Sequence, residues 1–411
     1  MSERRAHRSV DVAVIGGGII GLGIAWAVAQ TGRTAVVIDP DPAGGATFAA
    51  AGMLAAVSEL HYQEEALLEL MLASSALYPA FIESLGTASD LTGYQRTRTI
   101  NVGAEAADRQ ALADLRGVQL VNGLGVEPLT VREARELEPL LSPRISGAFL
   151  VGQDHQVDPR QLTARIQLAL VGLVRDGQPA VLRVRARGLL HDVAADASSR
   201  VTGVALVDGS TVSATEVVVA NGLGAADLSG LPEHLRLPLR PVYGEVLRLR
   251  VPEHLRPLLT CTVRGLVHGV PVYLVPRTDG TLVIGATQRE DGSSAVSAGG
   301  VHQLLRDAQE LVPAVSELEL LEVTARARPG TPDNAPLLGR VSRSGADSGD
   351  IPGLIIATGF FRHGVLLTPM AAQHCVDLIE GNATDRWRSF RPDRFSASRV
   401  LASASLNGGH S

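Results

Sequence analysis

The sequence predicts a mixed α/β (α+β) fold, in which a Rossmann-like nucleotide-binding domain is interleaved with a mainly antiparallel β-sheet domain. Strand-then-helix patterns open the chain, recur near residue 217 and return at residues 353–379. The stretch between residues 240 and 328 is instead mainly extended. No linker or repeat separates the two kinds of pattern, so we expect each domain to be assembled from several segments of the chain.

The first element is a short apolar strand, Val10–Ile15, that runs into Gly16-Gly17-Gly18-Ile19-Ile20-Gly21. In a nucleotide-binding turn Gly16 makes the tight turn, Gly18 lets the backbone approach a pyrophosphate, and Gly21 lets the next helix lie close to the strand. The pyrophosphate would lie at a helix N-terminus, where unpaired N–H groups and the positive dipole end favour an anion. Asp39 ends the second strand, where its carboxylate can accept from ribose hydroxyls and would repel a 2′-phosphate.

An alternative interpretation of this region is a membrane span. No residue from Val12 to Ala29 is charged, and an apolar run of about 18 residues can cross a bilayer. However, the glycines cluster at the start of the run, where they would unwind a helix, and Asp11 directly precedes it. We therefore predict a strand, a turn and a helix, followed by the second strand at 34–38.

The elements that follow are predicted from apolar periodicity and turn residues. Asp158-Pro159 begins a helix that extends from 160 to 174, because proline suits the first turn of a helix. Residues 386–411, rich in Ser, Arg and Gly, are predicted to form a loose tail. The other expected elements are helices at 59–82, 108–115, 131–137, 301–311 and 365–379, and strands at 99–102, 181–185, 201–207, 211–214, 217–220, 242–250, 272–275, 282–286, 318–327 and 354–356.

The composition argues against several functional classes. A net charge of −6 without a long basic run gives no support for a nucleic-acid partner. Cys261 and Cys375 are the only cysteines, which leaves no disulfide framework and no Cys-x-x-Cys metal or redox pair. All 37 Lys+Arg residues are arginine, so no lysine Schiff base or lysine general base can operate. Segment 1–10 does not resemble a secretory signal, and we expect a cytoplasmic protein.

A second strand–glycine–helix motif lies near the C-terminal end of the sequence. The apolar strand 353–358 ends at Gly359 and leads through Phe360-Phe361-Arg362-His363-Gly364 into a helix. A lone Gly-x-Gly-x-x-Gly is a weak signal, but the two motifs together indicate a flavoprotein. The N–H groups at this second helix start would stabilise negative charge on the reduced flavin ring.

From about Asp11 to Asn382 the chain resembles the glycine and D-amino-acid oxidase family, and within it the glycine oxidases of thiamine biosynthesis. The most specific match is the small-residue stretch 46–54, which in the family passes along the flavin. Small side chains let backbone N–H groups come within hydrogen-bonding distance of the isoalloxazine edge. The other matching blocks, in the family's order, are 153–159, 242–245, 273–277, 283–287, 328–333 and 359–364.

The resemblance implies noncovalent FAD, an antiparallel sheet over the substrate site, and oxidative deamination of small amino acids with O₂ as acceptor. It implies an FAD-binding domain formed by residues 9–90, 147–240 and 329–385, and a substrate-binding domain formed by 91–146 and 241–328. Family members are often homo-oligomers. No metal site is expected.

The resemblance also assigns the site residues. Arg328 would bind the substrate carboxylate, because a guanidinium donates two parallel hydrogen bonds to a planar carboxylate. Tyr273 would add a hydroxyl donor, and Arg362 lies at the flavin-facing turn. His363, in the same turn, is expected to be structural rather than an acid–base catalyst. The residues expected to bind FAD are Gly16, Gly18, Ile19, Ile20, Gly21, Asp39, Pro40, Ala46, Thr47, Ala51, Gly52, Met53, Gly359, Phe360, Phe361, Arg362, His363, Gly364, Val365 and Leu366.

Two departures from the family leave the exact substrate open. Pro271 replaces a histidine two positions before Tyr273, and Gln288 replaces a methionine after the Gly-Ala-Thr strand end. The alternatives to a glycine oxidase are an oxidase or dehydrogenase for sarcosine, proline or another small D-amino acid. A non-catalytic flavin-binding protein or a flavin-dependent modifying enzyme is a further alternative, because the fold alone determines no reaction. The presence of Arg328 and Tyr273 in their motifs favours a carboxylate substrate.

Overall fold

The computed structural model describes residues 7–62, 64–86, 89–173, 179–192, 200–343 and 349–396. The chain forms two compact units, each built from several segments. The predicted mixed α/β fold with interleaved segments is confirmed. The first unit comprises Met1–Gly44, Ile166–Pro241 and Arg328–Ser411, and the second comprises Gly45–Arg165 and Val242–Ala327.

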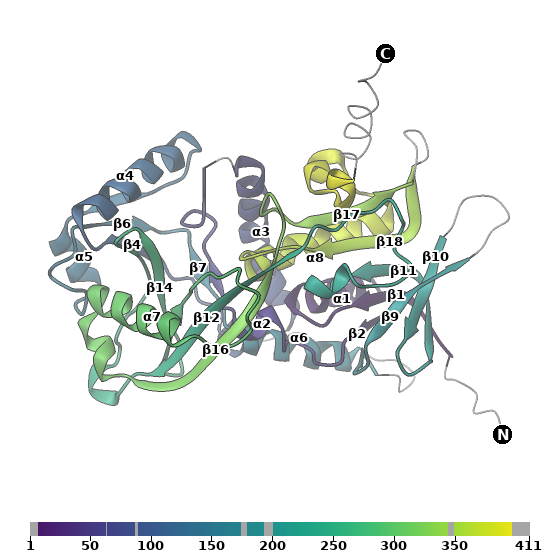
Figure 1. The fold of residues 1–411 in the computed structure, drawn as a ribbon, viewed down its shortest axis with the longest axis horizontal. Helices are drawn as coiled ribbons and strands as arrows, with labels where there is room; N and C mark the ends of the chain where they lie inside the picture. Colours follow the sequence, from purple (N-terminus) through teal and green to yellow (C-terminus); the bar gives the residue numbers. More distant parts are fainter. Residues whose placement is uncertain are drawn as a thin grey trace, which may run out of the picture. The chain divides into compact units, whose positions relative to one another are not determined.

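The first unit is organised around an eight-stranded sheet with the order β17–β18–β11–β1–β2–β8, to which β10 and β9 are added beside β11 (Figure 1). Strands β18, β11, β1, β2 and β8 run parallel to one another, so their carboxyl ends lie at one edge. Helices α1 (Ile19–Gln30) and α8 (Gly364–Glu380) pack against each other. The strands are β1 (His7–Ile15), β2 (Ala35–Ile38), β8 (Val181–Leu182), β9 (Ala186–Asp192), β10 (Arg200–Leu206), β11 (Thr211–Val219), β17 (Leu337–Ser342) and β18 (Asp350–Thr358).

The uncharged run from Val12 to Ala29 is a strand end, a turn and a helix, as predicted. Val12 and Val14 are fully buried in β1, which has a parallel neighbour on each side. Such central strands are apolar on both faces because both faces are covered, which gives a continuous hydrophobic sequence. The 12 residues of α1 are too few to cross a bilayer.

The prediction of a loose tail over 386–411 is wrong for its first part. Residues Asp385–Phe390 and Pro392–Phe395 form the short helices η5 and η6. Trp387 and Phe390 are buried, and Arg394 forms an ion pair of 2.9 Å with Asp333. The aromatic residues anchor a segment whose overall composition is polar. Residues 397–411 lie outside the described residues.

The second unit contains an eight-stranded sheet with the order β16–β12–β15–β14–β13–β4–β6–β5. Its neighbouring strands with a described register are antiparallel, except that β13 and β4 run parallel. One face packs on helix α7 (Ala298–Leu311) through a core that includes Val263, Leu274 and Leu304. The strands are β4 (Thr99–Gly103), β5 (Glu127–Leu129), β6 (Gly147–Val151), β12 (Arg240–Arg250), β13 (Thr262–Val267), β14 (Val270–Pro276), β15 (Thr281–Gly285) and β16 (Glu319–Gly330). Of these, β12 belongs to the second unit from Val242 onward and β16 as far as Ala327.

The opposite face of this sheet carries Val246, Val275 and Val283, which form a cluster with Ala51. Residues 45–90 and 147–165, which we assigned to the FAD-binding domain, belong to the second unit. Their elements are α2 (Ala46–Ala49), β3 (Met53–Leu54), α3 (Glu65–Ser84), β7 (His155–Gln156) and the first part of α6 (Pro159–Gly172). Helices α4 (Ala106–Val121) and α5 (Val131–Leu137) complete the unit.

Among the described helices, α3 is the one that is long and apolar enough to cross a membrane by length and composition. A core helix of a globular protein passes the same test. Leu70, Met71 and Tyr78 of α3 are buried within the protein, and Pro79 lies inside the helix. We therefore assign no membrane span to α3.

Candidate functional site

Three turns meet at the carboxyl edge of the parallel strands in the first unit. Gly16 follows β1, Ala220-Asn221-Gly222 follows β11, and Gly359 follows β18. Because these strands are parallel neighbours, the turns lie side by side, as in the crevice where open α/β sheets bind ligands. The structure therefore brings together the two glycine motifs, which are roughly 340 residues apart in the sequence.

The glycines of the first motif are required by close backbone contacts. Gly16 has φ +108°, and a Cβ atom there would lie 2.4 Å from the carbonyl oxygen of Ala220. A Cβ atom on Gly21 would lie 2.0 Å from the carbonyl oxygen of Gly16. Any side chain at either position would push the strand, turn and helix apart.

The N-termini of α1 and α8 are both suited to an anion. In α1 the first helical bond runs from Leu22 N–H to Gly18 C=O at 2.9 Å, and in α8 from Leu367 N–H to His363 C=O at 2.8 Å. The N–H groups before these donors have no acceptor within their own helix. Neither helix has a capping side chain or an acidic residue in its first turn, so no carboxylate of the helix itself offsets the positive end of its dipole.

Asp39 links the end of β2 to the glycine turn. Its carboxylate accepts hydrogen bonds from the N–H groups of Gly17 at 2.6 Å and Asp41 at 2.8 Å. It is partly exposed, and Pro40, which follows, is exposed. Each oxygen of a carboxylate has a second lone pair, so Asp39 can also accept from ribose hydroxyls. The glycine turn, the helix N-termini and Asp39 therefore fit a dinucleotide such as FAD.

The turn that carries Arg362 is joined to the segment that carries Arg328. Phe361 has φ +47°, and its N–H donates to the carbonyl of Pro329 at 3.0 Å. Arg362 Nε donates to His363 Nε2 at 3.1 Å, and the His363 side chain is buried. His363 Nε2 is thus an acceptor within the turn, and the structural role expected for this residue stays a prediction. Phe360, Val365 and Leu366 are also buried here.

The predicted flavin-lining segment lies in the second unit, next to Tyr273. Ala46 and Thr47 are in α2, and Gly52 has φ +73° with room for no side chain, since a Cβ atom would lie 1.9 Å from Val157 O. Ala51 belongs to the cluster on the sheet face, and Met53 and Tyr273 pack against that same cluster. The structure therefore brings together Ala51, Met53 and Tyr273.

Three arginines to which the sequence analysis gave no role hold the carbonyl groups of this segment. Arg160 Nε donates to Phe48 O at 2.9 Å while its guanidinium lies 3.6 Å from the centre of the Phe48 ring. Arg248 Nη2 lies 3.4 Å from the same oxygen, and Arg277 Nη2 donates to Ala51 O. Burial lowers the pKa of Arg277 to about 10, so the side chain stays charged at neutral pH.

A fourth arginine, Arg264 on β13, lies directly opposite Tyr273 on β14. Its Nη1 donates to Glu59 Oε1 and lies 3.7 Å from Met53 Sδ. This pair was not predicted from the sequence, because no strand was expected at β13 and Glu59 was expected to begin a helix. An arginine directly before a glycine in a largely apolar segment was the one available signal.

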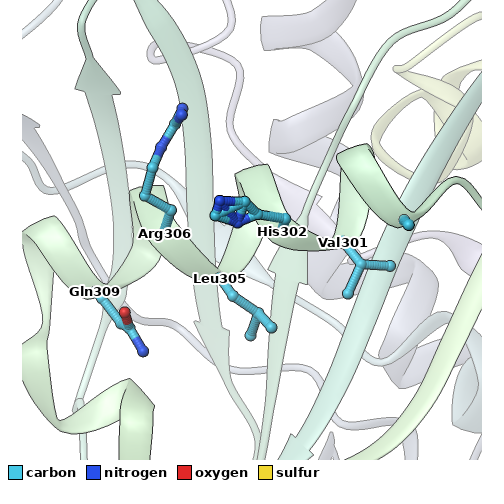
Figure 2. A pocket seen from close by; sticks show the side chains of 6 residues that line it. Val301, His302, Leu305, Arg306 and Gln309 are labelled. Carbon is cyan, nitrogen blue, oxygen red and sulfur yellow. The ribbon is translucent and has the colours of Figure 1, made fainter.

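A shallow depression on the second unit lies along the outer side of α7 and is lined by Ala298, Val301, His302, Leu305, Arg306 and Gln309 (Figure 2). None of the predicted site residues lines it, so it is not the candidate active site. The residues that the structure describes include no group of three or more His, Cys, Asp or Glu side chains that could hold a metal ion.

A family model described as FAD dependent oxidoreductase (DAO) matches residues 11–378. The chain is 34% identical to a glycine oxidase of Geobacillus kaustophilus, in an alignment that covers 92% of this chain and 94% of that protein. It is 29% identical to a bifunctional protein ThiO/ThiG of Trichormus variabilis, over 97% of this chain but 58% of that longer protein.

The fold agrees with these sequence relationships. The crystal structure of glycine oxidase from Geobacillus kaustophilus matches with a TM-score of 0.81 and 30% identity, covering 94% of this chain and 99% of that one. L-proline dehydrogenase from P. horikoshii has a TM-score of 0.78 at 20% identity, which shows a shared fold and no more.

Proposed function

This chain belongs to the FAD-dependent oxidoreductase family, and from that premise we propose that it oxidises glycine to the imine, which water converts to glyoxylate and ammonia. The observation that carries the proposal is 34% identity to a glycine oxidase over nearly the whole of both chains. FAD, when bound, would accept a hydride from the substrate Cα and pass the electrons to O₂, giving H₂O₂. By analogy with the ThiO relatives, the imine would serve thiazole synthesis in thiamine biosynthesis, in the cytoplasm.

The roles of the protein residues follow from their chemistry. Arg328 would hold the substrate carboxylate through two charge-assisted hydrogen bonds, and the Tyr273 hydroxyl would add a third. The glycine turn and the α1 N-terminus would hold the pyrophosphate, and Asp39 the ribose. The α8 N-terminus would stabilise negative charge that develops on the flavin ring. Flavin attachment is proposed to be noncovalent.

The first test compares substrates and acceptors. Purified protein loaded with FAD is supplied with glycine, sarcosine, D-alanine or D-proline, and H₂O₂ is measured. We expect the highest kcat/KM with glycine. A higher kcat/KM with sarcosine or D-proline would identify that compound as the preferred substrate instead. If a substrate bleaches the flavin without oxygen but no peroxide forms in air, the protein is a dehydrogenase rather than an oxidase.

The substitution Arg328→Ala tests the assignment of the carboxylate site. We expect kcat/KM for glycine to fall by about 100-fold or more, because charge-assisted hydrogen bonds contribute about 1.5–3 kcal/mol each. Arg132→Ala is the control, because Arg132 is an exposed residue of α5. Unchanged oxidation of every amino acid by the Arg328 variant would disprove the assignment.

A further inference from the structure

We propose that Arg264 forms a second anion-binding subsite beside Tyr273, so that the enzyme also accepts amino acids that carry a second carboxylate. This inference rests on the proposed function, because it takes the Tyr273 face of the sheet as the substrate face. It extends the substrate class from glycine to dicarboxylic amino acids, in which the second acid group is on the side chain or on the nitrogen.

The position of Arg264 follows from the sheet register. Across neighbouring strands, Asn101 lies opposite Arg264, Arg264 opposite Tyr273, and Tyr273 opposite Gly285. Residues directly opposite one another project from the same face, with Cβ atoms about 5 Å apart in an antiparallel pair. Arg264 and Tyr273 therefore emerge side by side from one face of the sheet.

The two side chains serve different groups of a ligand. The Tyr273 ring lies over Gly285, since a Cβ atom at Gly285 would lie 2.3 Å from the Tyr273 hydroxyl oxygen. Tyr273 thus leans toward β15 and away from β13, whereas Arg264 extends to Glu59 and Met53. When one carboxylate of a ligand binds the Tyr273 hydroxyl, the Arg264 guanidinium remains available for a second acceptor group on the same ligand.

The hydrogen bonds that Arg264 already makes indicate which kind of ligand group it can still bind. Its Nη1 is used by Glu59 and Met53, while Nε and Nη2 have no acceptor among the described residues of the second unit. The side chain is 17% exposed, so this edge of the guanidinium is not sealed in the core. Nε–H and Nη2–H are parallel donors that match the two oxygens of a carboxylate. A carboxamide offers only one acceptor oxygen to the same edge.

Glu59 and Arg264 are held in place before any ligand binds. The N–H groups of Val57 and Ser58 each donate to the buried Asp154 carboxylate at 3.0 Å. Glu59 N–H closes the turn onto Ala55 O at 3.0 Å. A rigid turn therefore presents Glu59 to Arg264, which reduces the conformational entropy that ligand binding would cost.

The Glu59–Arg264 pair also explains how a cation can be kept there in the absence of ligand. A lone, largely buried guanidinium would be costly, and Glu59 compensates its charge. Only one of the terminal nitrogens is used by this compensation. The pair is therefore close to neutral at rest, and its selectivity comes from the two parallel donors rather than from a large net positive charge.

The test uses holoenzyme and two matched substrate pairs. D-aspartate is compared with D-asparagine, and N-(carboxymethyl)glycine with sarcosine, so that each pair differs in the second carboxylate. We expect kcat/KM to be at least 10-fold higher for the dicarboxylic member of each pair. In Arg264→Gln this ratio should fall to about 1, and in Arg264→Lys to an intermediate value, because lysine keeps the charge but not the two-pronged edge. Arg250→Gln, at an exposed position of the same sheet, should keep the wild-type ratio.

Binding provides a readout that does not depend on turnover. Calorimetric titration with malonate and with acetate should show tighter malonate binding to wild-type holoenzyme, and Arg264→Gln should remove this difference. A wild-type ratio near 1, or an equal loss for D-asparagine and D-aspartate in the variant, would overturn the inference while glycine oxidation could still stand. If no amine is oxidised but malonate binding still depends on Arg264, the proposed function fails and the subsite stands. Circular dichroism identifies a variant that has not folded, in which case Arg264→Lys decides the question.

Discussion

At the residue scale, one guanidinium can serve several acceptors at fixed angles, and Arg160 illustrates this. Its Nε holds the Phe48 carbonyl, while its terminal nitrogens donate to both oxygens of Glu322 at 2.9 and 2.6 Å. A lysine has three donors on one atom and could not span this arrangement. The Glu322 carboxylate is therefore part of the support behind the small-residue segment, although it lies far from that segment in the sequence.

This ion pair predicts a pH dependence of stability. The hydrogen bonds from Arg160 lower the pKa of Glu322 from 4.5 to about 2. A carboxyl group with a lowered folded-state pKa stabilises the fold above its unfolded pKa, and this contribution is lost as the pH falls from about 4.5 to about 2. We expect Glu322→Gln to lower the free energy of unfolding by about 1–2 kcal/mol at pH 6, after allowance for solvent screening, and by less at pH 3.

Urea denaturation at the two pH values measures this effect. Glu319→Gln is the matched control, because Glu319 is on the same strand but is 64% exposed and lies 3.7 Å from Arg250. An exposed pair of this kind contributes little. A loss for Glu322→Gln that stays constant between pH 6 and pH 3 would contradict the assigned role of the ion pair.

At the scale of elements, the turn at Gly52 joins α2 to β3 and determines where the small-residue segment runs. Gly52 has φ +73°, and Gly123 has φ +74° at the end of α4. A Cβ atom at Gly52 would meet the backbone of Val157, whereas one at Gly123 would meet nothing within 4 Å. Comparing substitutions at the two glycines therefore separates two contributions to the loss of stability. One is the strain of a left-handed backbone, and the other is a steric clash.

Alanine substitutions at these two positions test the requirement. We expect Gly123→Ala to destabilise the protein by about 1 kcal/mol, the usual cost of a left-handed conformation for a residue with a Cβ atom. Gly52→Ala should cost at least about 3 kcal/mol, because the backbone must also move. Urea unfolding gives both values, and the FAD content after purification should fall for Gly52→Ala only. Equal losses in the two variants would show that the contact at Val157 is easily relieved.

The elements that could be predicted from the sequence are those with local signals. Glycines at fixed spacing and an apolar run identified β1 with α1 and β18 with α8, and the parallel register confirms that they lie at one edge. Strand β13 was not predicted, because its partners β14 and β4 supply its context and β4 is far away in the sequence. The helix expected from Glu59 begins at Glu65, since buried contacts with Asp154 and Gln119 hold residues 57–58 in a turn.

The same distinction applies to the site. The residues Ala51, Met53 and Tyr273 occur in motifs that resemble a family, and the structure brings them together. The roles of Arg328, Arg362 and Tyr273 in catalysis remain predictions. Arg264 and Glu59 are in no such motif, and their pairing depends on tertiary contacts across 205 positions of the chain. Only the register of β13 against β14 reveals that Arg264 shares a face with Tyr273.

At the scale of the whole molecule, both thiols are enclosed by the fold. Cys261 is 1% exposed and Cys375 is fully buried, and burial raises the pKa of Cys375 to about 12. A neutral, enclosed thiol is a poor nucleophile and cannot attack a flavin ring. We expect acid precipitation to release free FAD into the supernatant and leave a colourless pellet. A thiol reagent should label neither cysteine in the native protein and both in denaturant, whereas a yellow pellet would establish a covalent bond.

The central sheet of the first unit also has a consequence for how the protein is made. β1 and β2 leave the ribosome early, but β18, which borders β11 at the carboxyl edge, is synthesised roughly 340 residues later than β1. At about 5–20 residues per second, this interval lasts on the order of 20–70 s. During that time β11 lacks its neighbour β18, so the nascent chain exposes an apolar strand edge, and the N-terminus of α8 that we assign to the cofactor site is not yet made. Nascent molecules should therefore depend on chaperones, and FAD can complete its site only after synthesis has passed α8.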